Sequence, residues 1–267
     1  MRILWSFIRK DALTFVSYRF HMMMVLWGMA LMIGHFFFLG RVVGGGSENV
    51  LANWGGDYFP FAVLGIAFAQ YFDFALNGLS GQLRQGQTLG TLEALLVTRT
   101  PPLLILLGLV AFQFLFTTAM AMTYIASGVV TAGLSISFSA VALTLLLLLF
   151  TLGAFVGFGM MSASFILVFK KGEPIAMVFQ GLSYLLSGVY YPVSILPHWM
   201  QGLAQLLPLT HATRAVRIIW LQHGGLMDLL PSLAWLAAFA VVFIPVGMLT
   251  FRKALGAARR QGSLAQF

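Results

Sequence analysis

The chain has 267 residues, of which 60% are hydrophobic and only 8% are charged, and its formal net charge is +8. Soluble domains carry about 25% charged residues, so this composition excludes an ordinary soluble protein with a wetted surface. Cysteine is absent, which excludes thiolate catalysis, disulfides and cysteine metal sites. The apolar residues fall in long blocks, and such blocks predict helices that span a membrane.

Residues 1–19 contain too many charges to span a membrane. Basic and polar residues such as Arg2 and Arg9 recur at helical spacing on one side, and apolar residues such as Trp5 and Ile8 recur on the other. This pattern predicts an N-terminal amphipathic helix that lies in the membrane interface.

Six apolar blocks follow, and each predicts a membrane-spanning helix. The predicted spans lie near residues 20–40, 58–81, 101–130, 138–169, 175–191 and 231–251. The third and fourth blocks exceed the roughly 20 residues that cross a bilayer, so we expect those helices to tilt or to extend beyond it. The expected fold is therefore an all-α integral membrane protein, with one transmembrane permease domain over residues 1–267.

Residues 192–230, between the fifth and sixth predicted spans, break the pattern of long apolar blocks. In the first part, Trp199, Leu203 and Leu206 fall on one helical face. In the second part, an apolar face opposes a polar face that holds Thr213, Arg214 and Arg217. The pattern predicts two short amphipathic helices that dip into the membrane interface or lie on it.

The distribution of Lys and Arg predicts the orientation. With the N-terminus inside, three of the 15 Lys and Arg residues fall in outside segments (Arg41, Arg214 and Arg217), which leaves twelve in cytoplasmic segments. Cytoplasmic segments of membrane proteins are enriched in Lys and Arg, so both termini, including the tail at 252–267, are predicted to lie in the cytoplasm. We expect a multi-pass protein of the cytoplasmic (inner or plasma) membrane. Topology accounts for the positive charge, and no nucleic-acid partner is expected.

The cytoplasmic loop at residues 82–100 contains a narrow apolar stripe at helical spacing. The stripe consists of Leu89, Leu92, Leu95 and Leu96. An amphipathic helix between two long spans needs a surface to lie on, which is either the lipid headgroups or the groove of a soluble partner. The pattern favours the partner.

Polar residues interrupt two of the predicted spans. Gln70, Asp73 and Asn77 share one helical face of the second span, and Gln113 lies in the third. A carboxylate inside a membrane is costly, so Asp73 should face protein or a wet cavity. Two interpretations stay open. Interhelical hydrogen bonding is the more ordinary one, and the other is the lining of a translocation path, or an ion-coupling site in a secondary transporter.

The sequence favours a protein without catalytic activity. Residues 78–81 match the Gly-x-Ser-Gly of rhomboid proteases, but a chain with 28 glycines readily matches this tetrapeptide by chance. Ser80 would also need a histidine base, and the histidines lie beside the first span or in the 192–230 region on the far side. No His-Glu-x-x-His metal motif occurs. No lysine follows a glycine, so the chain lacks a Walker A loop and any ATP hydrolysis must come from another polypeptide.

Two segments resemble one family. The run from Gly90 through Thr91, Leu92 and Glu93 to Leu95 and Leu96, with Thr98 and Pro101 just after, resembles the cytoplasmic motif of the type-2 (ABC-2) ABC exporter permeases. The segment 187–197, followed by 206–211 and Arg217, resembles the family's signature around a re-entrant hairpin between its fifth and sixth spans. The order of the elements extends this resemblance over essentially the whole chain.

The resemblance implies a function and a set of sites. The expected contacts with the ATPase subunit are Gly90, Thr91, Leu92, Glu93, Leu95, Leu96, Lys170, Lys171 and Glu173. The expected external gate, in the hairpin at 192–230, includes Tyr191, Pro192, Leu196, Pro197 and Pro208. The family pairs two permeases, identical or similar, with two ATPase subunits that bind ATP and Mg²⁺, so no cofactor is expected in this chain.

The expected function is export of a hydrophobic or amphipathic substrate, such as a lipid, a lipid-linked glycan or a drug. Two other classes of function remain open at this stage. One is an ion-coupled secondary transporter that depends on Asp73, and the other is a membrane scaffold that moves no solute.

Overall fold

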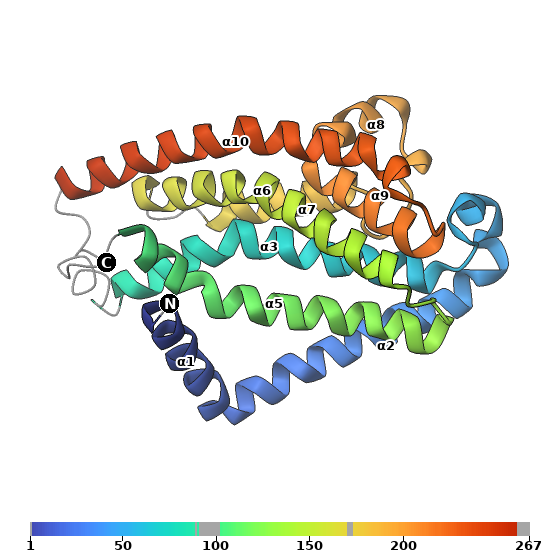
Figure 1. Ribbon diagram of the computed structural model, residues 1–267, viewed down its shortest axis with the longest axis horizontal. Helices are drawn as coiled ribbons and strands as arrows, with labels where there is room; N and C mark the ends of the chain where they lie inside the picture. The colour runs from blue at the N-terminus through green and yellow to red at the C-terminus, as the bar shows by residue number, and fades with distance from the viewer. Residues whose placement is uncertain (1, 89, 91–101, 170–172, 261–267) are drawn as a thin grey trace.

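The computed structural model describes residues 2–88, 90, 102–169 and 173–260, and within these residues the protein is helical without strands. Long helices run side by side as a bundle (Figure 1). The elements in chain order are α1 (Arg2–Ser17), α2 (Arg19–Leu51), η1 (Ala52–Trp54), α3 (Tyr58–Thr88), α5 (Pro102–Ala132), α6 (Phe138–Phe169), α7 (Glu173–Leu186), η2 (Val193–Ile195), α8 (His198–Gln205), α9 (Pro208–Leu221) and α10 (Leu226–Arg260).

Helix α3 forms the centre of the bundle. It contacts α2, α5, α6, α7 and α9, and 83% of its most apolar stretch is buried inside the protein. Phe61, Phe68 and Phe72 of α3 are fully buried, and Phe155 of α6 packs against Phe72 with 5.2 Å between the ring centroids. The apolar stretch of α3 has the lowest mean hydropathy of the five candidate spans, 1.5, and it carries Gln70 and Asp73. A helix with polar groups is costly to expose to lipid, which is consistent with the central place of α3.

Glycines bring α6 close to the helices on either side of it. A Cβ at Gly157 would lie 2.3 Å from the carbonyl carbon of Phe243 in α10, and one at Gly159 would lie 2.3 Å from the carbonyl oxygen of Ala75 in α3. Such distances are possible only without a side chain, because small residues let two helix backbones approach closely. Helix α6 therefore joins α10 to the central helix.

Among the described residues, five helices are long and apolar enough to cross a membrane. These stretches are Arg19–Val43, Tyr58–Gly86, Leu107–Ala132, Phe138–Phe165 and Leu226–Ala254, and they coincide with five of the six predicted spans. The remaining block forms α7, whose 14 residues extend about 21 Å, less than the hydrocarbon thickness of about 30 Å. Gly188, with φ of 70°, ends the apolar helix before Tyr191. A six-span topology therefore stays a prediction.

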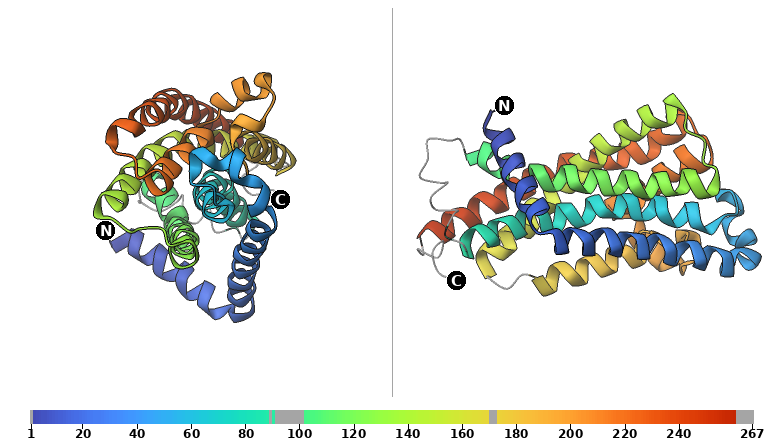
Figure 2. Two further views of the ribbon diagram at one scale, coloured as in Figure 1. Left: turned by 90° about the vertical axis from the view of Figure 1, so that its right-hand side faces the viewer. Right: turned by 90° about the horizontal axis from the view of Figure 1, so that it is seen from below.

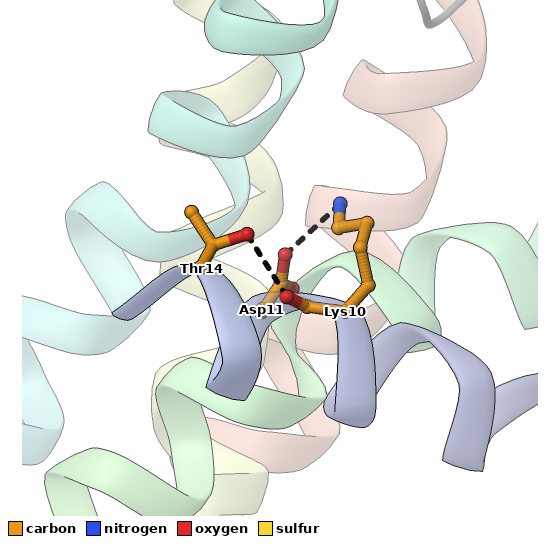
Figure 3. A network of polar contacts seen from close by, with 3 residues as sticks. All are labelled: Lys10, Asp11 and Thr14. Carbon is orange, nitrogen blue, oxygen red and sulfur yellow. Dashed lines mark hydrogen bonds and ion pairs between the residues drawn. The ribbon is translucent and has the colours of Figure 1, made fainter. Parts of the chain in front are cut away.

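Helix α1 lies at an angle to α2 and packs against α5 (Figure 2). The ring of Phe15 is 4.9 Å from that of Phe116 in α5, whereas Trp5 is 65% exposed. On the polar side, Lys10 forms an ion pair of 2.9 Å with Asp11 (Figure 3). The predicted amphipathic helix is thus present, and its position in a membrane interface stays a prediction.

The bundle has two distinct ends. The N-terminal part of α1 and the C-terminal parts of α3 and α10 gather at one end, whereas α8 and α9 lie toward the other (Figures 1 and 2). This division separates the segments that were predicted to be cytoplasmic from the segment that was predicted to be external.

Candidate functional site

Asp73 connects the central helix to α7. Its carboxylate accepts hydrogen bonds from the hydroxyl of Tyr184 and, at 2.5 Å, from Nε2 of Gln180. The hydroxyl oxygen of Tyr184 also lies 3.4 Å from the carbonyl oxygen of Ala69, one turn earlier on α3. The structure thus gives Asp73 the interhelical hydrogen bonds that were the more ordinary of the two interpretations.

The sequence interpretation did not identify the two partners of Asp73. Gln180 and Tyr184 are polar residues four positions apart in an otherwise apolar block, so they lie on the same helical face. The spacing of Gln180 and Tyr184 could have indicated a contact with Asp73, because a polar pair on one face of an apolar helix needs a polar partner across the interface.

The other predicted path residues take no part in the hydrogen bonds of Asp73 described above. Gln70 is half-buried, and Asn77 of α3 and Gln113 of α5 are exposed. Asn77 precedes the end of α3 at Thr88 by eleven residues, and Gln113 follows the start of α5 at Pro102 by eleven. Both amides therefore lie about 16 Å along their helices from the same end of the bundle. An amide that faces lipid is costly, so the exposure of Asn77 and Gln113 favours another protein chain or a wetted path beside them.

A second polar centre lies near the other end of the bundle, around Arg217 of α9. This side chain is only 3% exposed. Its Nε donates to the carbonyl oxygen of Phe61 at 3.1 Å, and Nη1 and Nη2 donate to the carbonyl oxygens of Gly188 and Val189, both at 2.8 Å. The guanidinium also lies 3.4 Å from the ring centroid of Phe61. Arg217 therefore holds together α9, the start of α3 and the turn after α7.

The charge of Arg217 persists despite its burial. Removal from water lowers the pKa of Arg217 to about 9, and the nearby Tyr58 opposes this shift. A guanidinium with this pKa remains protonated at neutral pH. The planar fork of arginine can satisfy several carbonyls at once, which lysine cannot do.

Backbone geometry makes room for Arg217. A Cβ at Gly65 would lie 2.3 Å from the carbonyl oxygen of Val189 and 2.5 Å from Nη2 of Arg217. Only glycine at this position lets α3 approach the turn and the guanidinium so closely.

Helix α9 is enclosed by the protein, and its predicted location in the membrane interface stays a prediction. Nearly the whole helix is buried, including Thr213 and Arg217 of the predicted polar face, and only Arg214 of that face is exposed. The polar groups find partners inside the protein. Thr213 Oγ1 donates to the carbonyl oxygen of Ser187 at 3.0 Å, and Trp220 Nε1 donates to Thr144 Oγ1 at 3.0 Å.

Helix α8 differs from α9, because its apolar face is open. Trp199, Leu203 and Leu206 are all exposed. This arrangement is the one predicted for a helix at the interface. The re-entrant path through the membrane stays a prediction.

The predicted gate residues lie in the connection from α7 to α9. Pro192 and Pro208 are buried, Tyr191 and Leu196 are half-buried and Pro197 is exposed. The hydroxyl of Tyr191 donates to the carbonyl oxygen of Leu185 at 2.5 Å, which folds this connection back onto the end of α7. Their role as a gate stays a prediction.

Most of the predicted coupling residues lie outside the described residues: Thr91, Leu92, Glu93, Leu95, Leu96, Lys170 and Lys171. Gly90 is exposed and has φ of 66°, in the left-handed region that favours glycine. Glu173 begins α7. Their contact with an ATPase stays a prediction.

Ser80, from the protease-like tetrapeptide, is buried, and its hydroxyl donates to the carbonyl oxygen of Leu76 at 3.0 Å within α3. This is the ordinary hydrogen bond of a serine inside a helix.

The family model described as ABC-2 type transporter matches residues 3–221, from α1 to the end of α9. The chain belongs to the ABC-2 type transporter family. This ABC-2 protein is therefore a membrane subunit of an ABC transporter, and the resemblance found in the sequence is confirmed. Members of the family are transport subunits rather than enzymes, and they typically work with an ATPase subunit. A search of curated proteins gave no match.

Proposed function

We propose that this ABC-2 permease is the transmembrane subunit of an exporter for a hydrophobic or amphipathic substrate, such as a lipid, a lipid-linked glycan or a drug. A separate subunit hydrolyses ATP with Mg²⁺, and two permease copies, identical or similar, form the path with two ATPase subunits. The chain lies in the cytoplasmic membrane with both termini inside.

The observation that carries the choice of substrate is the pair of exposed amides at one depth, Asn77 and Gln113, in otherwise apolar helices. Phe74 and Leu79, on either side of Asn77 in α3, line an apolar cavity of about 160 Å³ together with residues of α5, α6 and α10. Asn77 and Gln113 are not among the residues that line this cavity. Apolar walls together with exposed amides elsewhere on α3 and α5 support a substrate that is mostly apolar and carries a polar part.

The coupling proposal rests on where helices begin and end. Thr88 ends α3 and Phe169 ends α6, whereas Pro102 begins α5 and Glu173 begins α7. The long helices run antiparallel along the bundle, so these positions fall at the end that also holds the N-terminal part of α1 (Figure 1). An ATPase subunit at that end would contact the 82–100 segment, which begins within α3, and the 170–174 segment, which includes the start of α7.

Helix α7 connects the proposed ATPase-binding end of the bundle to the end that carries the hairpin, so it could transmit a displacement between them. A displacement at Glu173 would move α7 and, through Asp73 and Tyr184, the central helix. The same helix leads to the Gly188–Val189 turn that holds Arg217, and so to the hairpin that we propose as the external gate. A rigid helix can transmit such a displacement over its length.

The test is purification of the tagged chain in a gentle detergent, with mass spectrometry and ATPase assays of the complex. We expect a stoichiometric subunit with a Walker motif, whose ATPase rate changes on substrate addition. The double variant Leu92→Asp with Glu93→Lys should lose this subunit. Leu206→Asp, an exposed leucine at the opposite end, serves as the control and should keep it.

If the double variant keeps the ATPase subunit and its response to substrate, the proposed contact of Leu92 and Glu93 with that subunit is wrong. If no ATPase accompanies the wild-type chain in several mild detergents, the exporter proposal fails. An ion-coupled carrier would then be tested by Asp73→Asn and dependence on an ion gradient.

A further inference from the structure

A polar cleft of about 460 Å³ opens at the end of the bundle that carries α8 and α9. Its walls come from η1, from the 187–194 turn and from α9. Ser187, Thr210, Thr213, Arg214 and Arg217 are among the lining residues. Two cations and several hydroxyl groups therefore converge on one cleft.

The guanidinium of Arg217 has more N–H groups than its three hydrogen bonds to carbonyl oxygens use. Its three bonds to carbonyl oxygens use one N–H at each nitrogen. Arginine carries a second N–H on Nη1 and on Nη2. Arg217 lines the cleft, and its side chain is fixed by the three carbonyls.

Among the described residues, four buried hydroxyl groups have no hydrogen-bond partner, and Ser187 is the one of the four that lines the cleft. Its side chain is fully buried. A buried hydroxyl without a partner costs free energy. An acceptor atom bound in the cleft would remove this cost.

No carboxylate forms an ion pair with Arg214 or Arg217 among the described residues. Arg214, three positions before Arg217 on α9, is exposed. The ion pair found in the described part of the chain joins Lys10 and Asp11 in α1, near the other end of the bundle. Two arginines without a carboxylate partner favour an anion over a neutral or cationic ligand.

We propose that this cleft binds a phosphate group, to which Arg214, Arg217 and Ser187 donate hydrogen bonds. The phosphate is either that of an anionic phospholipid headgroup or free inorganic phosphate. A tetrahedral phosphate presents several acceptor oxygens and suits donors that converge from different directions, and arginine forks match its geometry. The site belongs to the permease alone and requires neither ATPase nor transport.

The experiment uses the full chain in a neutral detergent without added lipid. Binding of radiolabelled inorganic phosphate is measured by equilibrium dialysis, with chloride at equal ionic strength as the reference. Binding of phosphatidylglycerol is measured by native mass spectrometry, with diacylglycerol as the lipid that lacks phosphate. We expect saturable binding of at least one phosphate probe.

Arg214→Gln should weaken that binding about tenfold, because it removes a charge-assisted donor from an exposed position where folding is not at risk. The control is Arg41→Gln, which removes an exposed cation of α2 that does not line the cleft and should leave the affinity unchanged.

Ser187→Ala has a matched control four residues earlier in the chain. Ser183 is also buried with an unpartnered Oγ, but it does not line the cleft. Both alanine variants should match or exceed the wild-type melting temperature without ligand, because each removes an unsatisfied hydroxyl. Only Ser187→Ala should weaken phosphate binding, by several fold.

Binding of inorganic phosphate supports the site with free phosphate as a source, and binding of phosphatidylglycerol alone supports the site with the headgroup as the source. The proposal is overturned if neither probe binds saturably, or if Arg214→Gln and Arg41→Gln have the same affinity. Equal affinities for Ser187→Ala and Ser183→Ala would remove Ser187 from the site.

Discussion

At the scale of single residues, the protein stabilises its buried charge with backbone carbonyls. Arg217 contacts three of them, from α3 and from the turn after α7, together with the ring of Phe61. Carbonyl dipoles compensate a cation without a second charge, whose own burial would be costly. The arrangement depends on Gly65, because any side chain there would meet Val189 or Arg217.

The substitution Gly65→Ala should therefore lower the free energy of unfolding by about 1–3 kcal/mol, since the added methyl group overpacks a tight site. The measurement is the melting temperature in detergent. Gly28→Ala is the matched control, because a Cβ at Gly28 in α2 meets nothing within 4 Å. Gly28→Ala should be neutral or slightly stabilising. Equal melting temperatures for the two variants would refute the close approach at Gly65.

At the scale of elements, the bundle combines two kinds of helix contact. Helix α6 packs through glycines against α3 and α10, where backbones approach closely. Helix α7 is joined to α3 by the side-chain hydrogen bonds of Asp73. The second kind of contact depends on a few polar atoms, so α7 should separate from the bundle more easily than α6 does.

The variant Tyr184→Phe tests this difference, because it keeps the ring and removes the hydroxyl that donates to Asp73. An interhelical hydrogen bond of this kind contributes about 1 kcal/mol in a membrane protein, so amide hydrogen exchange in α7 should accelerate about fivefold. Exchange in α6 and α10 should stay as in the wild type. The control is Tyr18→Phe, an exposed tyrosine between α1 and α2. An unchanged α7 would show that the contact with Asp73 does not hold this helix.

At the scale of the whole molecule, the two ends differ in composition. In the described part of the chain, the end with α1 and the C-terminal part of α10 holds most of the Lys and Arg, whereas the other end holds the hairpin and the polar cleft. A Lys and Arg excess marks the cytoplasmic side of a membrane protein. The natural absence of cysteine allows each end to be labelled through one introduced thiol.

We expect Ser194→Cys, exposed at the hairpin end, to react with a membrane-impermeant maleimide in intact cells. Lys253→Cys, exposed near the end of α10, should react only after the membrane is permeabilised. The cysteine-free parent chain controls for background labelling. Labelling of Lys253→Cys in intact cells would reverse the proposed orientation.

The sequence by itself determined the helical class, five of the spans and the family, because these depend on local properties: the length of apolar blocks and short motifs in order along the chain. Only the tertiary structure decided which polar groups meet. The polar face of α9 predicted contact with the membrane surface, but Thr213 and Arg217 are buried against carbonyls more than 25 residues away in the chain. Likewise, Asp73 finds its partners on α7, over 100 residues later. An amphipathic pattern in the sequence shows that one face of a helix needs hydrogen-bond partners. It does not show whether water, lipid headgroups or the protein itself supplies these partners, because that depends on how the helices pack.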